Sequence, residues 1–233
     1  MLAIAVVGYK KSGKTTLAME LAQALKEMGL SVTLAKHSHH GFDEKPETDT
    51  ARFRDSADMV IGFSPGGSFV SWPTERPLAE LLPLVNTDIL VLEGGKTLGI
   101  MPRIIIAEDE ATAKDLDPDL ALAVYGDTAL DAVMATRDIK GLARFAASGG
   151  FLLPGLDCGG CGRENCRALA VEIVAGKATL ADCAAQNGQL AITINGQPLA
   201  LNPFIERMLR GGIVGMLREL KGFAPGPVDI HLG

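Results

Sequence analysis

Short apolar runs alternate with amphipathic stretches along the chain as far as about residue 147. Runs such as Ile89–Leu92 and Ile104–Ala107 are apolar throughout, which is typical of strands buried on both faces of a parallel sheet. The stretch Thr15–Met28 spaces its apolar residues as a helix does, and Gly29 follows as a natural helix stop. This alternation predicts an α/β fold in which helices flank a mostly parallel sheet.

The same pattern places the individual elements of this domain. We expect strands at Leu2–Val7, Ser31–Lys36, Met59–Phe63, Ser68–Trp72, Ile89–Glu93, Arg103–Ala107 and Leu120–Val124. We expect helices at Lys14–Met28, Asp49–Ala57, Leu78–Val85, Glu108–Lys114 and Asp138–Ala147. Because ligands bind outside the carboxyl ends of such strands, the segments after Val7, after Lys36 and after Glu93 should lie close together.

The pattern changes at residues 148–150, where a serine and two glycines break the last of these helices. We therefore expect an α/β domain at 1–148, a small region at 155–186 that holds all four cysteines, and an extension at 187–233. The cysteine region contains one helical stretch, Arg167–Ala175. In the extension, the sequence predicts a hairpin about Asn195-Gly196, a helix from Pro203 to Leu220 interrupted at Gly211-Gly212, and a last strand at Val228–Leu232.

The residues from Gly8 to Thr15 read G-x-x-x-x-G-K-[ST], between a predicted strand and a predicted helix. Successive backbone N–H groups in such a loop form an anion-binding nest, and the helix dipole adds positive potential. The glycines Gly8 and Gly13 allow close approach of the backbone. Lys14 reaches the β- and γ-phosphates, and the Thr15 hydroxyl binds Mg²⁺. The sequence therefore predicts a nucleoside triphosphate site.

The strand ending at Glu93 resembles a Walker-B strand, whose carboxylate would hold Mg²⁺ directly or through water. Asp49 is placed either to cap a helix or to act as a switch acid near Mg²⁺ and the attacking water, which makes Lys14 and Asp49 the candidate catalytic residues. His37, His39 and His40 follow Lys36. They fit a polar loop that closes over the nucleotide better than a transition-metal site, because no cysteine or paired acid lies nearby in sequence.

Composition and charge narrow the class of protein. The 233 residues carry a formal net charge of −6, which disfavours a nonspecific nucleic-acid binder. No apolar run approaches the ~20 residues of a membrane span, and the N-terminus lacks a secretory pattern. We therefore expect a cytoplasmic protein without a membrane or nucleic-acid partner, in which clustered cysteines are metal ligands or redox groups.

The four cysteines, Cys158, Cys161, Cys166 and Cys183, are spaced C-x₂-C-x₄-C-x₁₆-C. Structural Cys₄ zinc sites usually show two separated knuckles, whereas here three cysteines bunch together and the fourth stands alone. The spacing favours a [4Fe–4S] cluster over zinc, and free or disulfide-bonded thiols remain a third interpretation. Residues 155–186 also resemble the four-cysteine iron–sulfur domain of corrinoid iron–sulfur proteins and of acetyl-CoA decarbonylase/synthase subunits, including a Gly176-Lys177 turn before the last cysteine.

Residues 1–107 resemble the molybdopterin-guanine dinucleotide biosynthesis protein B family. The likeness rests on G-Y-x-x-S-G-K-T-T-L, on K-H-x-H-H-x-F-D-x-x-P-x-x-D-[ST], and on a strand ending E-G-x-K followed by P-[RK]-I. The sequence departs from the family's E-G-[FY]-K at Gly95, and from its short forms in carrying the cysteine region.

The resemblance implies a dimeric, GTP-binding adapter with slow intrinsic GTPase activity, which assists the guanylyltransferase that attaches GMP to molybdopterin. It implies that Thr15 and Glu93 bind Mg²⁺, with Asp49 as a further candidate ligand. It implies that the phosphates are cradled by Gly8, Tyr9, Lys10, Lys11, Ser12, Gly13, Lys14, Thr15 and Thr16, and that the effector-facing loop is lined by Lys36, His37, His40 and Asp43.

The identity of the base cannot be read from the residues, because the chain has no N-K-x-D segment. Val124-Tyr125-Gly126-Asp127 is a candidate base-side loop, although a simple strand-to-helix turn explains the segment better. Three functions stay open: the adapter of molybdenum or tungsten cofactor synthesis with an iron–sulfur domain for docking or electron transfer, a nucleotide-driven chaperone or reductive activator of a corrinoid, nickel or molybdenum enzyme, and an interaction module whose metal is structural.

Overall fold

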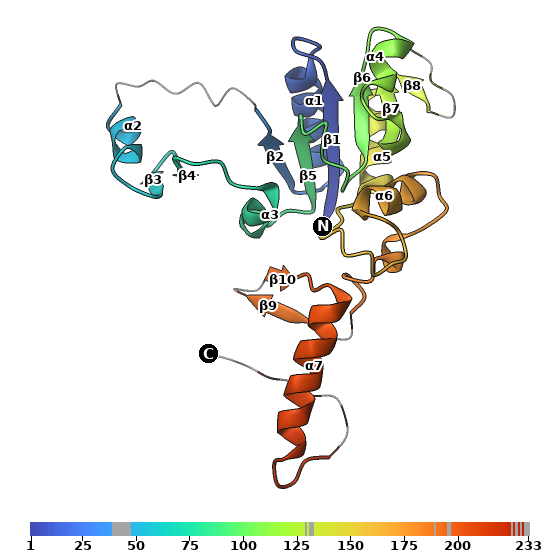
Figure 1. Ribbon diagram of the computed structural model, residues 1–233. Coiled ribbons are helices and arrows are strands. Elements are labelled where there is room, and N and C mark those ends of the chain that lie inside the picture. Colours follow the sequence, from blue (N-terminus) through green and yellow to red (C-terminus); the bar gives the residue numbers. More distant parts are fainter. Residues whose placement is uncertain are drawn as a thin grey trace. The chain divides into compact units, whose positions relative to one another are not determined.

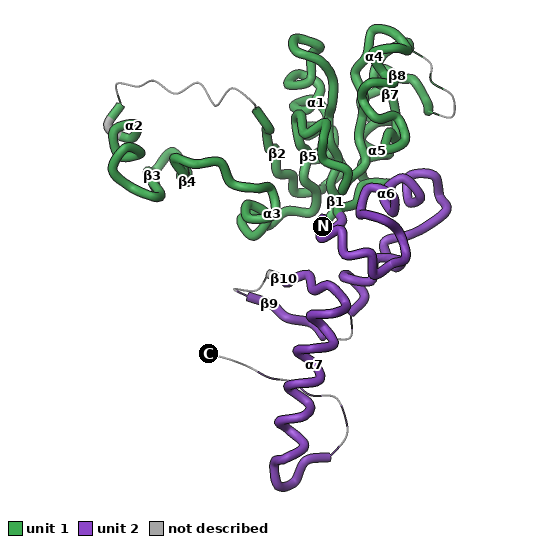
Figure 2. Tube along the Cα trace, viewed as in Figure 1, with its two compact units in different colours: residues 1–152 green, residues 153–233 purple. Residues whose placement is uncertain are grey.

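The computed structural model divides into two compact units, Met1–Leu152 and Leu153–Gly233, which are described separately (Figure 2). It describes residues 1–38, 48–128, 130, 133–188, 190–194, 197–224, 226, 228 and 230, without the side chains of Asp49, Gln197 and Pro198. Within these ranges no helix is both long enough and apolar enough to cross a membrane.

A six-stranded parallel sheet forms the centre of the first unit (Figure 1), as the sequence predicts. Its order is β2 (Val32–Lys36), β5 (Ile89–Glu93), β1 (Leu2–Gly8), β6 (Arg103–Ile106), β7 (Ala121–Tyr125) and β8 (Ala135–Thr136). The predicted bounds agree with the observed ones to within a residue or two, but β8 was not predicted. With two residues it is too short to show a periodic pattern.

Both faces of the sheet are buried, which explains why its strands are apolar throughout. Along β1 the side chains alternate: Ile4 and Val6 pack on one face, and Ala3, Ala5 and Val7 on the other. The first face is covered by α1 (Lys14–Glu27) and α5 (Ile139–Gly149). The second face packs against apolar residues of α3 (Leu78–Leu81), the 3₁₀ helix η1 (Leu82–Leu84), α4 (Glu110–Lys114) and the segment leading to the 3₁₀ helix η2 (Pro118–Leu120).

Two of the predicted strands do not join this sheet. The strands β3 (Val60–Ser64) and β4 (Gly67–Ser71) pair with each other as an antiparallel hairpin after α2 (Asp49–Arg54). The connection between them is only two residues long, which suits a hairpin and is too short for a parallel crossover.

The described part of the second unit contains a short α-helix, a 3₁₀ helix, an antiparallel pair of short strands and one long helix. Its elements are α6 (Cys166–Val174), the 3₁₀ helix η3 (Leu180–Asp182), the antiparallel strands β9 (Ile192–Ile194) and β10 (Gln197–Leu199), and α7 (Pro203–Arg218). The predicted interruption at Gly211-Gly212 is wrong, because α7 runs through both glycines. The hairpin turn and most of the predicted strand at 228–232 lie outside the described residues.

Candidate functional site

The loop between β1 and α1 is tightly packed around Gly8. A Cβ atom added to Gly8 would lie 2.5 Å from Ser12 Oγ and 3.0 Å from the carbonyl oxygen of Ile106, so only glycine fits there. Gly13, the residue before α1, has a φ of 90°, a left-handed conformation that favours glycine. Lys11 shares that conformation, with a φ of 66°. The loop therefore has the tight, glycine-dependent shape that the motif predicts.

Inside this loop a polar atom is left without a partner. Ser12 Oγ is buried and makes no hydrogen bond to any described residue. Lys14 donates from Nζ to the backbone oxygen of Tyr9, across the mouth of the loop. Burial lowers the pKa of Lys14, the Glu93 carboxylate opposes that change, and the ammonium of Lys36 adds to it. A buried hydroxyl and a desolvated ammonium at a helix N-terminus suit an anionic ligand.

The residues expected to hold Mg²⁺ meet at the carboxyl end of the sheet. Thr15 Oγ1 donates to Glu93 Oε2 at 2.8 Å, and Lys36 Nζ lies 3.4 Å from the same oxygen. The strand order β2-β5-β1 produces this contact, because Lys36 is in register with Glu93 and Glu93 with Val6. The Glu93 side chain is only 13% exposed, so its charge is poorly screened by water. An oxygen-rich corner of this kind suits a hard divalent cation.

The neighbouring loop is only partly described. The backbone N–H of His37 donates to the carbonyl oxygen of Glu93 at 2.9 Å, and a Cβ at Gly94 would lie 2.9 Å from the carbonyl oxygen of His37. This places His37 beside the strand end, as predicted. His39, His40 and Asp43 lie outside the described residues.

Asp49 is the first residue of α2, and its side chain also lies outside what the structure describes, so its role near Mg²⁺ stays a prediction. The N-cap of α2 is Thr48, whose Oγ1 accepts from the Ala51 N–H at 3.3 Å. The structure therefore caps this helix with Thr48, one residue before Asp49.

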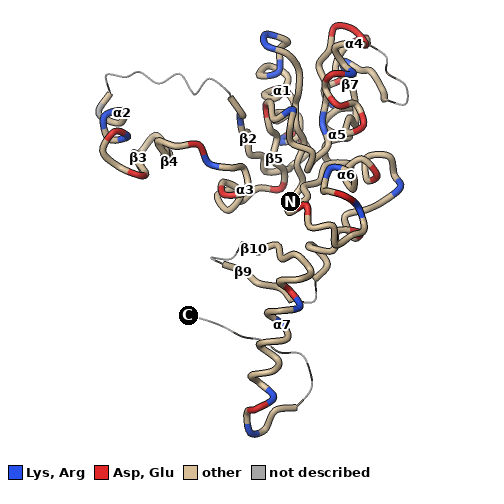
Figure 3. Tube along the Cα trace, viewed as in Figure 1, with Lys and Arg blue, Asp and Glu red and all other residues tan. Residues whose placement is uncertain are grey.

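A pocket of about 670 Å³ extends from the phosphate loop to the ends of β6 and β7. It is lined by Tyr9, Lys10, Lys11, Ser12, Ile106, Ala107, Glu108, Thr112, Tyr125, Gly126, Asp127, Thr128 and Arg137. Figure 3 shows positive charge on the loop between β1 and α1 and negative charge around α4. The candidate base-side loop thus shares a pocket with the phosphate loop. Arg137 was not foreseen, because it follows the unpredicted strand β8.

Sequence reasoning also missed the contacts that Tyr9 and Arg103 make beside this site. Tyr9 donates from its hydroxyl to Asp115 Oδ2 at 3.1 Å, which raises the pKa of Tyr9, and Lys96 Nζ lies 5.7 Å from the centre of the Tyr9 ring. Arg103 is fully buried. Its guanidinium donates to the carbonyl oxygens of Lys96 (3.1 Å), Leu98 (2.9 Å) and Leu116 (2.9 Å) and lies 3.7 Å from Asp117.

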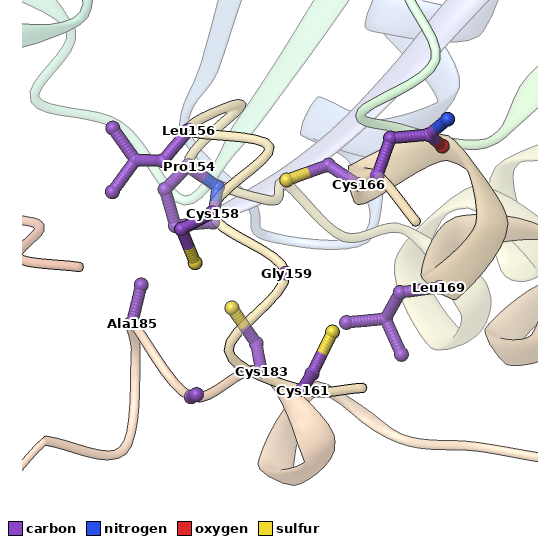
Figure 4. A pocket seen from close by; sticks show the side chains of 11 residues that line it. Pro154, Leu156, Cys158, Gly159, Cys161, Cys166, Leu169, Cys183 and Ala185 are labelled. Carbon is purple, nitrogen blue, oxygen red and sulfur yellow. The ribbon is translucent and has the colours of Figure 1, made fainter. Parts of the chain in front are cut away.

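The four cysteines of the second unit line one pocket (Figure 4), and the close-up shows their sulfur atoms turned towards a common space. Cys183 is buried, Cys161 and Cys166 are partly exposed, and Cys158 is exposed. The other lining residues include Pro154, Leu156, Leu169, Ala184 and Ala185, which are apolar. Within the described residues, no group of three or more His, Cys, Asp and Glu side chains is arranged to hold a metal ion.

A few hydrogen bonds made by side chains hold the cysteine loop in shape. Cys166 begins α6; its N–H donates to Asp157 Oδ1 at 2.6 Å, and burial raises the pKa of its thiol. Arg163 donates to the carbonyl oxygen of Cys161 at 2.9 Å and to Glu172 Oε2 from Nη2 at 2.7 Å and from Nε at 3.1 Å. Four thiols in an apolar pocket are a donor set that fits an iron–sulfur cluster.

Comparison with known proteins agrees with both halves of this description. The family model "Molybdopterin guanine dinucleotide synthesis protein B" matches residues 3–126, and the model "Putative Fe-S cluster" matches residues 153–185. A Methanocaldococcus jannaschii protein named "Putative molybdopterin-guanine dinucleotide biosynthesis adapter protein" is 27% identical over 231 residues, which cover 95% of this chain and 93% of its own. An Escherichia coli adapter protein of the same synthesis is 29% identical over 61% of this chain and 89% of its own.

The solved structures support the fold. A crystal structure of MobB from Bacillus subtilis covers 64% of this chain and 97% of its own, at 22% identity and a TM-score of 0.52. The family model spans more than half of the 233 residues. The chain therefore belongs to the molybdopterin guanine dinucleotide synthesis protein B family.

Proposed function

We propose that this protein is a GTP-binding adapter of molybdenum or tungsten cofactor synthesis that assists formation of molybdopterin-guanine dinucleotide. The observation that carries the proposal is the contact of Thr15 Oγ1 with Glu93 Oε2 at 2.8 Å beside the phosphate loop. It joins the two groups that hold Mg²⁺ in phosphate-loop proteins. The named relatives supply the biosynthetic context.

In this proposal the backbone N–H groups from Tyr9 to Thr16 bind the phosphates, and Lys14 neutralises their charge. Thr15 and Glu93 hold Mg²⁺, with Asp49 as a further acid. Because Lys36 already pairs with Glu93, the entering cation displaces that ammonium from the carboxylate. Lys36 then becomes available to contact phosphate or partner, which links nucleotide occupancy to the loop that the partner would read.

The second unit would hold a [4Fe–4S] cluster through Cys158, Cys161, Cys166 and Cys183. When bound, such a cluster supplies one-electron redox chemistry or a rigid docking surface. The remaining part of the proposal is a homodimer that acts on a molybdopterin guanylyltransferase or on a molybdoenzyme. Slow GTP hydrolysis would time the association, because Arg137, the arginine among the residues that line the described pocket, is paired with Asp127.

The adapter proposal is tested with protein purified without oxygen. We expect GTP to bind in the presence of Mg²⁺ and to increase the rate at which a guanylyltransferase converts molybdopterin to its guanine dinucleotide. Lys14→Ala should weaken GTP binding roughly a hundredfold, since it removes charge-assisted hydrogen bonds worth about 3 kcal/mol. Lys26→Ala, an exposed lysine in the last turn of α1, is the matched control and should bind normally. Absence of GTP binding, or binding without any effect on guanylylation, contradicts the proposal.

The exposed Cys158 favours a second candidate function, a nucleotide-gated reductive activator of a metalloenzyme. A cluster with one ligand at the surface is accessible to an electron-transfer partner. In that case reduction of the cluster changes the affinity for GTP or the rate of its hydrolysis. Equal GTP affinity for the oxidised and the dithionite-reduced protein favours the adapter.

A further inference from the structure

The pocket beside the phosphate loop contains a carboxylate at the end of β7. Asp127 and Arg137 both line this pocket, and Tyr9–Ser12 of the phosphate loop line it as well. With a volume of about 670 Å³, the pocket falls within the range of small-molecule and cofactor sites, roughly 300–1,000 Å³. A nucleotide whose phosphates lie in the loop therefore has room to place its base towards Asp127.

Asp127 is paired with Arg137 at the surface, with side chains 81% and 63% exposed, respectively. Arg137 donates from Nε to Asp127 Oδ1 at 3.0 Å and from Nη2 to Asp127 Oδ2 at 2.8 Å, a planar two-point contact. The hydrogen bonds and charge of Arg137 lower the pKa of Asp127, so the carboxylate stays ionised at neutral pH. The surrounding turn is also fixed, since the Gly126 N–H donates to Thr136 O at 3.1 Å and Thr128 Oγ1 to Ala107 O at 3.2 Å.

The pair leaves acceptor capacity on the carboxylate. Each oxygen of Asp127 has two lone-pair sites, and Arg137 occupies one of them on each oxygen. Because the planar contact with Arg137 uses the syn site of each oxygen, the remaining sites point to opposite sides of the carboxylate and a base meets one oxygen. The Watson–Crick edge of guanine presents two adjacent donors, N1–H and the exocyclic N2 amine, which can both donate to that oxygen. Adenine presents an acceptor, N1, at the corresponding position, and a carboxylate repels it.

We propose that Asp127, positioned by Arg137, reads the base of the bound nucleotide and selects guanine over adenine. This inference rests on the proposed nucleotide function and names the residue that determines the base. It gives a chain without an N-K-x-D segment a means of discriminating GTP from ATP. Glu108 lines the same pocket, but no hydrogen bond to another described side chain orients it.

The inference is tested by varying the hydrogen-bonding groups of the base and the side chain at position 127 in the same experiment. Binding of GTP, ITP, XTP and ATP is measured by titration calorimetry for the full chain and for Asp127→Asn. The wild type should prefer GTP to ITP, which lacks the N2 amine, and to ATP, each by about tenfold or more, because a hydrogen bond to a charged group is worth roughly 1.5–3 kcal/mol. Asp127→Asn should lose about tenfold in GTP affinity and gain in XTP affinity, because the new amide N–H can donate to the 2-oxo group of xanthine.

Asp138→Asn is the matched control, since Asp138 is an exposed carboxylate near Arg137 in sequence that does not line the pocket. It should keep the wild-type order of bases. Equal binding of GTP and ATP by the wild type, or loss of GTP by Asp127→Asn without a gain in XTP, overturns the inference and leaves the phosphate loop standing. Wild-type protein that binds no triphosphate at all overturns the proposed function as well.

Discussion

In the first unit the site residues stand at the ends of strands that are buried on both faces, whereas in the second they stand on a loop and at the edges of short helices. Two clusters of apolar side chains hold the first unit's sheet. Among the described residues of the second unit, the buried side chains are few: Leu153, Leu169, Ala170, Cys183 and Leu201. Hydrophobic burial is the main favourable term in folding, so the two units differ in what can stabilise them.

We therefore expect the two sites to differ in how far their folding depends on a bound ligand. The phosphate loop is shaped by a sheet with apolar side chains packed on both faces, so we expect the sheet to stay folded when the nucleotide is lost. The cysteine pocket has too small a core to fix four sulfur atoms by packing alone. A metal group bound there would contribute folding free energy directly, as structural metals do in small domains.

The largest expected effect follows from removing one thiol. Cys161→Ala should abolish binding of iron and sulfide and remove the hydrogen-exchange protection of residues 153–185, because structural metal binding is worth about 10 kcal/mol or more. Protection of residues 1–152 and affinity for GTP should not change. Ala185→Ser, which alters the wall of the same pocket without removing a ligand, is the control. A Cys161→Ala protein that stays protected in both units would remove the distinction between them.

The first unit should instead be most sensitive to loss of its buried arginine. Arg103→Met removes the donor to the carbonyl oxygens of Lys96, Leu98 and Leu116 and the guanidinium beside Asp117, at a cost of about 3 kcal/mol or more. Guanidinium chloride denaturation, followed by a signal from the first unit, measures the change. Arg144→Met removes only an exposed ion pair and should cost less than about 1 kcal/mol. Equal midpoints for the two variants would show that Arg103 has no special role.

The contrast between Arg103 and Glu93 also shows how far sequence reasoning reaches. Glu93 was placed correctly because a run of apolar residues ending in an acid is a local pattern, and parallel strands bring their carboxyl ends together. Arg103 lies in a similar run, but its partners are backbone carbonyls on other segments, which leave no mark in the sequence. The Tyr9–Asp115 contact escaped for the same reason, since 106 positions separate the two residues.

The errors in the secondary structure have a related cause. Gly211 and Gly212 predicted a break because each glycine costs a helix about 1 kcal/mol. The helix α7 continues through them; its N-cap, Asn202, accepts from the N–H groups of Phe204 and Ile205, both at 3.0 Å. The apolar periodicity and this cap outweigh the unfavourable helix propensity of the two glycines. A prediction made from single residues cannot compare these opposing contributions.

A smaller effect is expected from the arginine of the second unit. Arg163 braces the loop by binding the carbonyl oxygen of Cys161 and the carboxylate of Glu172, but its side chain is 23% exposed. Arg163→Met should therefore cost about 1 kcal/mol and make a chelator remove iron a few times faster. Lys177→Met, an exposed lysine after α6, is the control. Unchanged iron release in Arg163→Met would indicate that the sulfur ligands alone hold the loop.

The smallest expected effect is a dependence on pH that belongs to the first unit alone. Burial lowers the pKa of Lys14 below its ordinary value of 10.5, so between the two values the unfolded chain binds more protons than the folded one. The free energy of unfolding of the first unit should therefore rise with pH across that interval, and Lys14→Met should lack this rise while Lys26→Met keeps it. A bound triphosphate restores the charge on Lys14, so GTP binding should take up protons in the same interval, as calorimetry in buffers of different ionisation enthalpy can measure. Because Lys14 is only partly buried, both effects are small. If Lys14→Met and wild type show the same slope and the same proton uptake, then the ammonium is not desolvated by the loop, and the first unit's site is less preformed than its sheet.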